Sequence, residues 1–383
     1  MKTLSPRLAS VIADSVYGVI DATPEKPSLF EVHTYVKDYF DFPGNHIVQG
    51  TSGGWILRIT SGFVLVGVGK GEFAGSRLIA IRGSASLADA ATDAHIGVTT
   101  STSGNAVHSG FQQTFESFRQ TLQPYVERAP AGTVFHCVGH SLGGALASLA
   151  ADWIKHSFGR TTCLYTFGAP RVGLENFATA TTHRLDGIYR CTHGADPAPV
   201  VPLWPFTQAP VGGLEYRLDT GTGISFSAHL MSEDAVPGYL NTANYSSWDV
   251  LAHRARVHFY ATTRLRYQDR HQASFTTEWA ERLGEALVTL LKDAGCYGAV
   301  MGQQALMTGF TFYDLLARTL EQIAQASVTL GEQVRGLLGH MLVFAGRVLE
   351  AVVDLTFSFI RWVFEVTIDR LYGEARQAMA AVH

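Results

Sequence analysis

Cysteine, charge and long apolar runs are all scarce in this chain of 383 residues. Four cysteines exclude a disulfide-rich scaffold at this length. Charged residues make up only 16%, the net charge is −4, and no block of lysine and arginine occurs, which argues against nucleic acid as the main partner. No uncharged apolar run reaches the roughly 18 residues that span a bilayer.

The N-terminal residues also lack the apolar segment of a cleavable secretory signal. Residues 8–20 are apolar, but Asp14 interrupts them, and they predict an amphipathic helix. We therefore expect synthesis in the cytoplasm without a cleavable signal. Export through a signal-independent secretion system is the route that this expectation leaves open.

Hydrophobic residues are abundant, at 46% of the chain, and the mean hydropathy of +0.10 is high for a soluble protein. Strand-like runs alternate with helical stretches through the first half. An α/β fold with a mostly parallel sheet is therefore expected, and its first two strands should form a hairpin. The strand-like runs are residues 63–69, 76–81, 133–138, 162–167 and 187–192.

The pattern changes after about residue 245, and from Ser274 onward the spacing is helical and proline is absent. The sequence thus predicts an α/β domain over 1–245 and an all-α region over 246–383. Within the latter, 22 of the 35 residues from 337 to 371 are hydrophobic, with charges confined to one stripe. This pattern predicts one apolar amphipathic helix that packs in a bundle, on a partner, or peripherally on a membrane.

A candidate nucleophile lies at Ser141, in the Gly-x-Ser-x-Gly sequence of residues 139–143. An apolar run precedes it and a small-residue helix follows, which is the context of a strand-to-helix nucleophile turn. Such a turn strains the serine backbone and leaves no room for side chains on either side. It would raise the Ser141 hydroxyl above the sheet and place the Leu142 N–H where it can bind an oxyanion.

A serine hydroxyl needs a histidine base that a carboxylate orients, and in this architecture the carboxylate comes next along the chain. Asp196 directly follows the strand-like run at 187–192. A turn at the carboxyl end of a parallel strand is where such sites are built. Asp196 is therefore the candidate carboxylate, although an Asp-Pro sequence also forms ordinary turns.

Several blocks, in order, resemble the class 3 (fungal-type) lipases of the α/β-hydrolase fold, over roughly residues 8–245. They are Ile81-Arg82-Gly83-Ser84, residues 107–111, residues 138–144, residues 165–173 and the Asp196-Pro197 segment through Pro202. The resemblance implies that Ser141 is the nucleophile and Asp196 the triad carboxylate. It also implies that the backbone N–H of Ser84 joins that of Leu142 in the oxyanion hole.

The same resemblance implies a lid over about residues 85–98, which is poor in bulky side chains here. Asp93 matches an acidic residue beside that lid, and an ion pair is the expected role. His108 matches a structural histidine near the site.

The base is harder to choose, because the chain has 15 histidines. His229, in a short loop after a strand-like segment at 213–218, resembles the family's histidine loop best. His258 is the alternative, since aromatic residues follow it as in the fungal enzymes, and His253 is a third candidate. His253 and His258 also fit a solvated helix face, because arginines lie beside them.

We expect a serine ester hydrolase that acts on lipid acyl esters, as a lipase or phospholipase A1, through an acyl-enzyme. A bacterial antibacterial effector with an inhibitory immunity protein fits the same features. The alternatives are a membrane- or partner-binding protein dominated by its helical tail, and a soluble carboxylesterase for small esters. No cofactor or metal is expected, because the chemistry needs none and no His/Cys cluster has zinc spacing.

Overall fold

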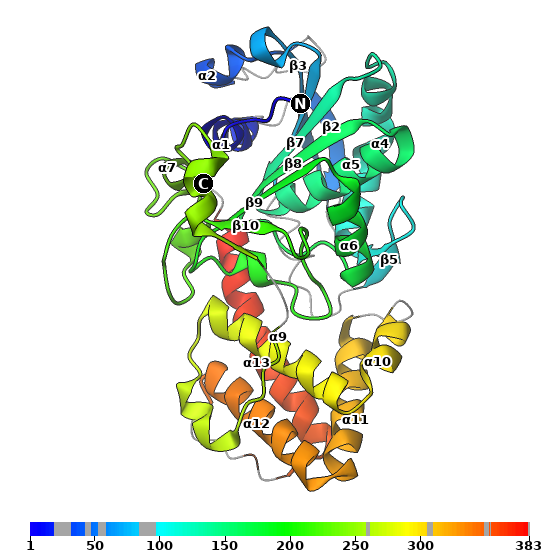
Figure 1. Ribbon diagram of the computed structural model, residues 1–383, viewed down its shortest axis with the longest axis vertical. Helices are drawn as coiled ribbons and strands as arrows, with labels where there is room; N and C mark the ends of the chain where they lie inside the picture. Colours follow the sequence, from blue (N-terminus) through cyan, green and yellow to red (C-terminus); the bar gives the residue numbers. More distant parts are fainter. Residues whose placement is uncertain are drawn as a thin grey trace.

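Helices flank a central sheet in the N-terminal part of the molecule, and an all-α region extends from one end of it (Figure 1). The predicted fold class is therefore confirmed. The computed structural model describes residues 1–18, 32–42, 47–52, 59–83, 97–257, 261–304, 309–347, 352 and 354–381.

The sheet has the order β1-β3-β4-β7-β8-β9-β10-β11, with β2 paired to β3. Strands β4, β7, β8, β9 and β10 are parallel, whereas the outer pairs are antiparallel, including the predicted β3–β4 hairpin. The bounds are β1 Phe40–Asp41, β2 Ile47–Ser52, β3 Ile59–Gly69, β4 Ser76–Ile81, β7 Val134–His140, β8 Thr161–Phe167, β9 Gly187–Thr192, β10 Leu214–Arg217 and β11 Ala255–Val257; β5 Val98–Thr100 and β6 Ala106–His108 form a separate pair.

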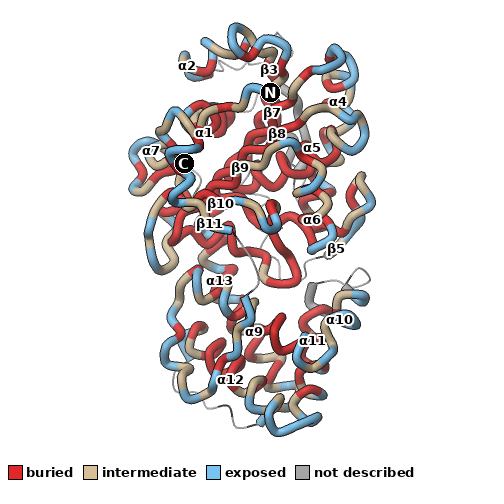
Figure 2. Tube along the Cα trace, viewed as in Figure 1, coloured by how far each residue is buried: buried red, intermediate tan, exposed pale blue. Residues whose placement is uncertain are grey.

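Both faces of the sheet are covered, which is why its central strands are buried along almost their whole length. Along β7, Phe135 and Cys137 join one buried cluster and Val138 joins the other, because successive side chains point to opposite faces. Figure 2 shows these strands buried along most of their length. The covering helices are α1 Pro6–Ser15, α2 Thr34–Lys37, α7 Tyr239–Thr242 and α8 Trp248–Leu251 on one face, and α4 Ser109–Glu127, α5 Leu142–Phe158 and α6 Glu175–Arg184 on the other.

The C-terminal region consists of helices that share one buried cluster with the α4–α5 face of the sheet. Among the residues described, no helix is both long and apolar enough to cross a membrane. The helices are α9 Thr277–Asp293, α10 Tyr297–Gln304, α11 Gly309–Ala326, α12 Val328–Phe344 and α13 Phe357–Ala380.

The prediction of one continuous helix over 337–371 is wrong, because α12 ends at Phe344 and α13 begins at Phe357. Gly346 terminates α12 in the left-handed conformation, with φ of +77°. Its N–H donates to the Val343 carbonyl and the next N–H, of Arg347, donates to Leu342, which is the Schellman arrangement of a helix end. The apolar periodicity continues through this break and conceals it.

The boundary at residue 245 also needs correction. Strand β11 lies beyond it, yet pairs with β10 as the last strand of the sheet. Arg256 within β11 binds the buried carboxylate of Glu215 on β10 and the carboxylate of Glu281 on α9. The α/β part thus extends to at least Val257, and this ion-pair chain fastens it to the helical region.

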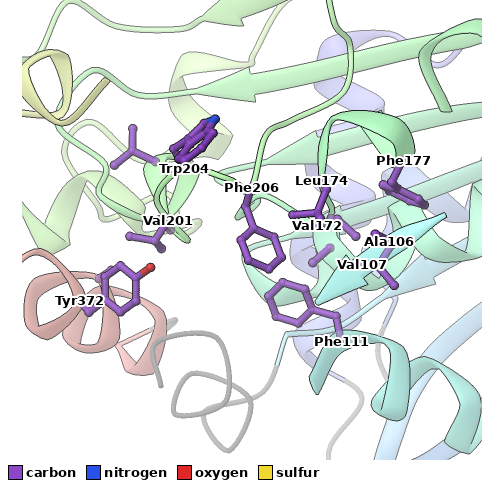
Figure 3. Packing of buried hydrophobic residues seen from close by; sticks show 14 of the residues in the cluster. Ala106, Val107, Phe111, Val172, Leu174, Phe177, Val201, Trp204, Phe206 and Tyr372 are labelled. Carbon is purple, nitrogen blue, oxygen red and sulfur yellow. The ribbon is translucent and has the colours of Figure 1, made fainter. Parts of the chain in front are cut away.

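Helices α9 and α13 also contact the loop that follows β9. The hydroxyl of Tyr372 on α13 accepts a hydrogen bond of 3.1 Å from the Leu203 N–H. The hydroxyl of Thr277 donates to the Gly194 carbonyl. Figure 3 shows Tyr372 reaching from α13 toward Val201 and Trp204. The helical region therefore packs directly on the segment that carries Asp196.

We predict that Gly336→Ala destabilises the protein and that Gly373→Ala does not. A Cβ at Gly336 on α12 would lie 1.8 Å from the Leu265 carbonyl oxygen, so backbone must shift, at a cost of about 1–3 kcal/mol or more. Gly373 on α13 has open space, and alanine there favours the helix by about 0.5–1 kcal/mol. Denaturant unfolding monitored by circular dichroism measures both; equal stability of the two variants would contradict this packing.

Candidate active site

Ser141 occupies the turn between β7 and α5, and its φ of 56° is the only positive value among the described non-glycine residues. The turn is tight enough to require glycine on both sides. A Cβ at Gly139 would lie 2.3 Å from the Gly143 carbonyl oxygen, and one at Gly143 would lie 2.1 Å from that of Ile81. The sequence Gly-x-Ser-x-Gly is thus needed for backbone segments to pass one another at this point.

A chain of hydrogen bonds leads from the serine to the aspartate. The Ser141 Oγ lies 2.7 Å from His229 Nε2, to which it donates. His229 Nδ1 donates in turn to Asp196, at 2.9 Å from Oδ2 and 3.0 Å from Oδ1. All three side chains are buried. The structure therefore brings together the three residues that the sequence singled out as a nucleophile, a base and an orienting carboxylate.

Further donors stabilise the Asp196 carboxylate in its buried position. Tyr239 OH donates to Oδ2 at 2.7 Å, and the Ala198 N–H donates to Oδ1 at 2.9 Å. Gly168 packs against the pair, since a Cβ there would lie 2.7 Å from Asp196 Oδ2 and 3.1 Å from His229 Nδ1. A carboxylate fixed by several donors holds the histidine in the orientation and tautomer that can accept the serine proton.

Two other buried histidines fix the short turn that carries His229, at Phe226–His229. His140 Nε2 donates to the His229 carbonyl at 2.8 Å, and Tyr17 OH donates to His140 Nδ1 at 2.9 Å. His193 Nδ1 donates to the Ala228 carbonyl at 2.6 Å. Burial lowers the pKa of His193, so its ring is neutral and keeps Nε2 as an acceptor for Thr242.

An oxyanion would be bound at the N-terminus of α5, where the first N–H groups have no partner within the helix. Leu142 is the first residue of α5 and is buried. The segment after β4 passes close by, because a Cβ at Gly83 would lie 3.4 Å from the Leu142 nitrogen. Ser84, Asp93 and residues 85–96 of the predicted lid lie outside the described residues.

Of the two other histidines considered as the base, the structure describes only one. His258 lies outside the described residues, whereas His253 is exposed, in a short 3-10 turn at Ala252–Arg254. The expected solvated helix face is not found there, since β11 follows immediately. His108 is buried at the start of α4, where its Nδ1 accepts from the Gly110 N–H and its ring stacks on Phe111. It caps this helix.

Sequence reasoning missed the supporting residues Tyr17, His193 and Tyr239. Nothing local in the sequence marks them, because each reaches the site only through the packing of the turn after α1, the loop after β9, and α7. His140 could have been found from the sequence, because it directly precedes the nucleophile in the Gly-x-Ser-x-Gly motif.

The assembled groups can perform one kind of chemistry without further help. A hydroxyl that can lose its proton to an adjacent imidazole attacks an acyl carbonyl carbon, and a helix N-terminus stabilises the negative oxygen that results.

Comparison with known proteins identifies the family of the segment that carries Ser141 and Asp196. The family model described as Lipase (class 3) matches residues 78–206, which include Ser141 and Asp196. These residues belong to the class 3 lipase family. The sheet with its parallel centre, the turn that carries Ser141 and the loop that carries Asp196 are accordingly those of an α/β-hydrolase fold.

Individual relatives of this class 3 lipase domain also match only part of the chain. Secreted mono- and diacylglycerol lipase 1 of Fusarium solani is 35% identical over 149 residues, which is 38% of this chain and 44% of that protein. Toxin TseL of Vibrio cholerae is 35% identical over 114 residues, or 28% of this chain and 17% of the toxin. The chain thus spans less than half the length of these relatives.

A solved mono- and diacylglycerol lipase from Aspergillus oryzae aligns with 58% of this chain and 82% of its own, at 22% identity and a TM-score of 0.42.

Tyr239→Phe should slow the reaction of Ser141 with a fluorophosphonate by about 10- to 100-fold, the worth of one hydrogen bond to a charged group. Tyr125→Phe is the matched control, because its hydroxyl bonds to the Gly67 carbonyl on β3 and to no residue of the site. Labelling rates read by mass spectrometry compare the two. If both variants label at the rate of the unaltered chain, Tyr239 does not support Asp196.

Proposed function

We propose that this chain is a serine ester hydrolase that acts on lipid acyl esters, with acylglycerols as the favoured substrates. The observation that carries the proposal is the hydrogen-bonded series Ser141, His229 and Asp196 at a strained strand-to-helix turn. The relatives named as mono- and diacylglycerol lipases support the choice of substrate class.

The reaction follows from the geometry. His229 Nε2 takes the proton of Ser141 as Oγ forms a bond to the acyl carbon, and the Leu142 N–H binds the oxyanion. The carbonyl re-forms as the bond to the alcohol breaks, and His229 returns the proton to that alcohol. Water then attacks the acyl-enzyme with His229 again as base, which releases the fatty acid and restores Ser141. Asp196 keeps the His229 ring oriented through its contact with Nδ1 in both half-reactions.

Phospholipids and small esters can react by the same mechanism, and they differ in the groups attached to the acyl ester. Phospholipase A1 activity requires a phospholipid head group to be accepted beside Ser141, and a carboxylesterase requires only a small ester. Peripheral contact of the C-terminal helices with a membrane would favour the two lipid activities. A substrate panel separates these possibilities.

His229→Ala should lower hydrolysis of a diacylglycerol by about four orders of magnitude or more, because members of a triad act as a unit. His253→Ala, an exposed histidine 24 positions later, should retain the full rate. Hydrolysis of diacylglycerol, phospholipid vesicles and p-nitrophenyl butyrate by each variant provides the measurement. An active His229→Ala protein together with an inactive His258→Ala protein would reassign the base.

We also propose an antibacterial role, with an inhibitory immunity protein and export without a cleavable signal. Its support is the similarity of this domain to the protein named Toxin TseL. A lipid hydrolase that attacks membranes is harmful in the compartment of its substrate, so a producing cell would need an inhibitor.

Expression in the periplasm of a test bacterium should arrest growth, whereas Ser141→Ala should be harmless at the same protein level. Growth curves and immunoblots measure both. Equal growth of the two strains would contradict the antibacterial role and leave the hydrolase proposal to the substrate panel.

A further inference from the structure

An apolar cavity lies where the helical bundle meets the α/β part. Helices α9, α11, α12 and α13 supply most of its wall, and Leu203 and Trp204 close it from the loop after β9. The helical side chains are almost all aliphatic or aromatic, with Met341, Phe364 and Leu371 among them. Such a surface favours an alkyl chain over water.

One cation lines this cavity. Arg171, three residues after Gly168, is only 4% exposed. The Arg171 Nε has no hydrogen-bond partner among the described residues. The Arg171 Nη1 donates to the Pro202 carbonyl, but this hydrogen bond is long, at 3.5 Å. No carboxylate in the described part of the chain forms an ion pair with it. A buried, unpaired charge is costly, so this guanidinium is suited to bind an anion.

The other groups at the cavity do not supply that anion. Glu281 lines the wall, but both of its carboxylate oxygens bind Arg256, at 2.8 and 3.0 Å. Burial raises the pKa of Tyr313, which lines the cavity, and of the neighbouring Tyr372, so both phenols stay neutral. The cavity therefore combines apolar walls with one uncompensated positive charge.

We propose that this cavity binds a single-chain fatty acid, with its carboxylate on the Arg171 guanidinium and its alkyl chain among α9, α11, α12 and α13. Arginine is suited to a carboxylate because its planar fork can donate two parallel hydrogen bonds. Ser141, His229 and Asp196 are not among the residues that line this cavity. The inference goes beyond the proposed function, in which a fatty acid is only the product released at Ser141.

The size of the cavity limits the chain. Its free volume is about 40 Å³, a few times the roughly 10–15 Å³ that a cavity needs to hold one water molecule. Unbranched, flexible side chains such as Met341 must move aside to admit several methylenes. A medium-length acid such as octanoate is therefore the appropriate probe.

The test uses the full chain with Ser141→Ala, so that binding is measured without turnover. Isothermal titration calorimetry with octanoate and with octan-1-ol compares the same alkyl chain with and without the charge. We expect octanoate to bind at least about ten-fold more tightly, and Arg171→Met to remove that advantage while octan-1-ol affinity stays the same.

A second variant fills the cavity. Gly284 on α9 lines it, and the nearest atom to a Cβ there is Trp204 Cβ at 4.0 Å, so Gly284→Leu has room for its first carbon and extends into the void. It should weaken both ligands by about ten-fold or more. Gly373→Leu, at an exposed position on α13, is the matched control and should bind as before.

If octanoate and octan-1-ol bind equally tightly to the chain that retains Arg171, the proposal is wrong. Octanoate binding that survives both Arg171→Met and Gly284→Leu also overturns it, because the ligand would then lie elsewhere, such as beside Ser141. Ester hydrolysis is assayed separately on the chain with Ser141 intact. A failure to bind octanoate would therefore leave the hydrolase proposal standing, and a failure to hydrolyse esters would leave the binding result standing.

Discussion

The close passage of backbone at the β7–α5 turn is the constraint on which the site depends. Gly139, Gly143 and the end of β4 lie so near one another that a single added Cβ would overlap a carbonyl oxygen. This contact fixes the strained conformation of Ser141 and the position of the α5 N-terminus relative to β4. The nucleophile and the oxyanion-binding N–H are thus set by the same few backbone atoms, and strain at Ser141 persists because the surrounding sheet and helix hold it.

The second requirement is a complete set of hydrogen bonds around buried polar groups. Asp196, His229, His140 and His193 are all buried, and each has partners that come from different elements. Removing one partner would leave a buried polar group unsatisfied, at a cost of about 1–3 kcal/mol. The loops that carry Asp196 and His229 therefore hold each other in place, and α9 and α13 pack on the first of them through Thr277 and Tyr372.

The parts that could be predicted from sequence are those with local signals. Ser141 lies in a motif whose glycines have a steric reason, Asp196 follows an apolar strand, and His229 lies in a short loop after the last parallel strand. Tyr239 could not be found in this way, because only the packing of α7 brings it to Asp196. The helix over 337–371 was predicted as continuous because apolar periodicity carries no record of the turn at Gly346. Strand β11 was missed because a three-residue segment that follows Arg254 and contains Arg256 resembles a solvated surface until Glu215 and Glu281 are placed beside Arg256.

The central claim is that Ser141 is an activated nucleophile, and mapping the adduct of a fluorophosphonate tests it most directly. The full chain is treated with the reagent, its intact mass is measured, and the modified peptide is sequenced by mass spectrometry. We expect one adduct per chain, located on Ser141 and absent from Ser141→Ala. A chain that takes up no reagent, or that carries the adduct on another residue, would contradict it.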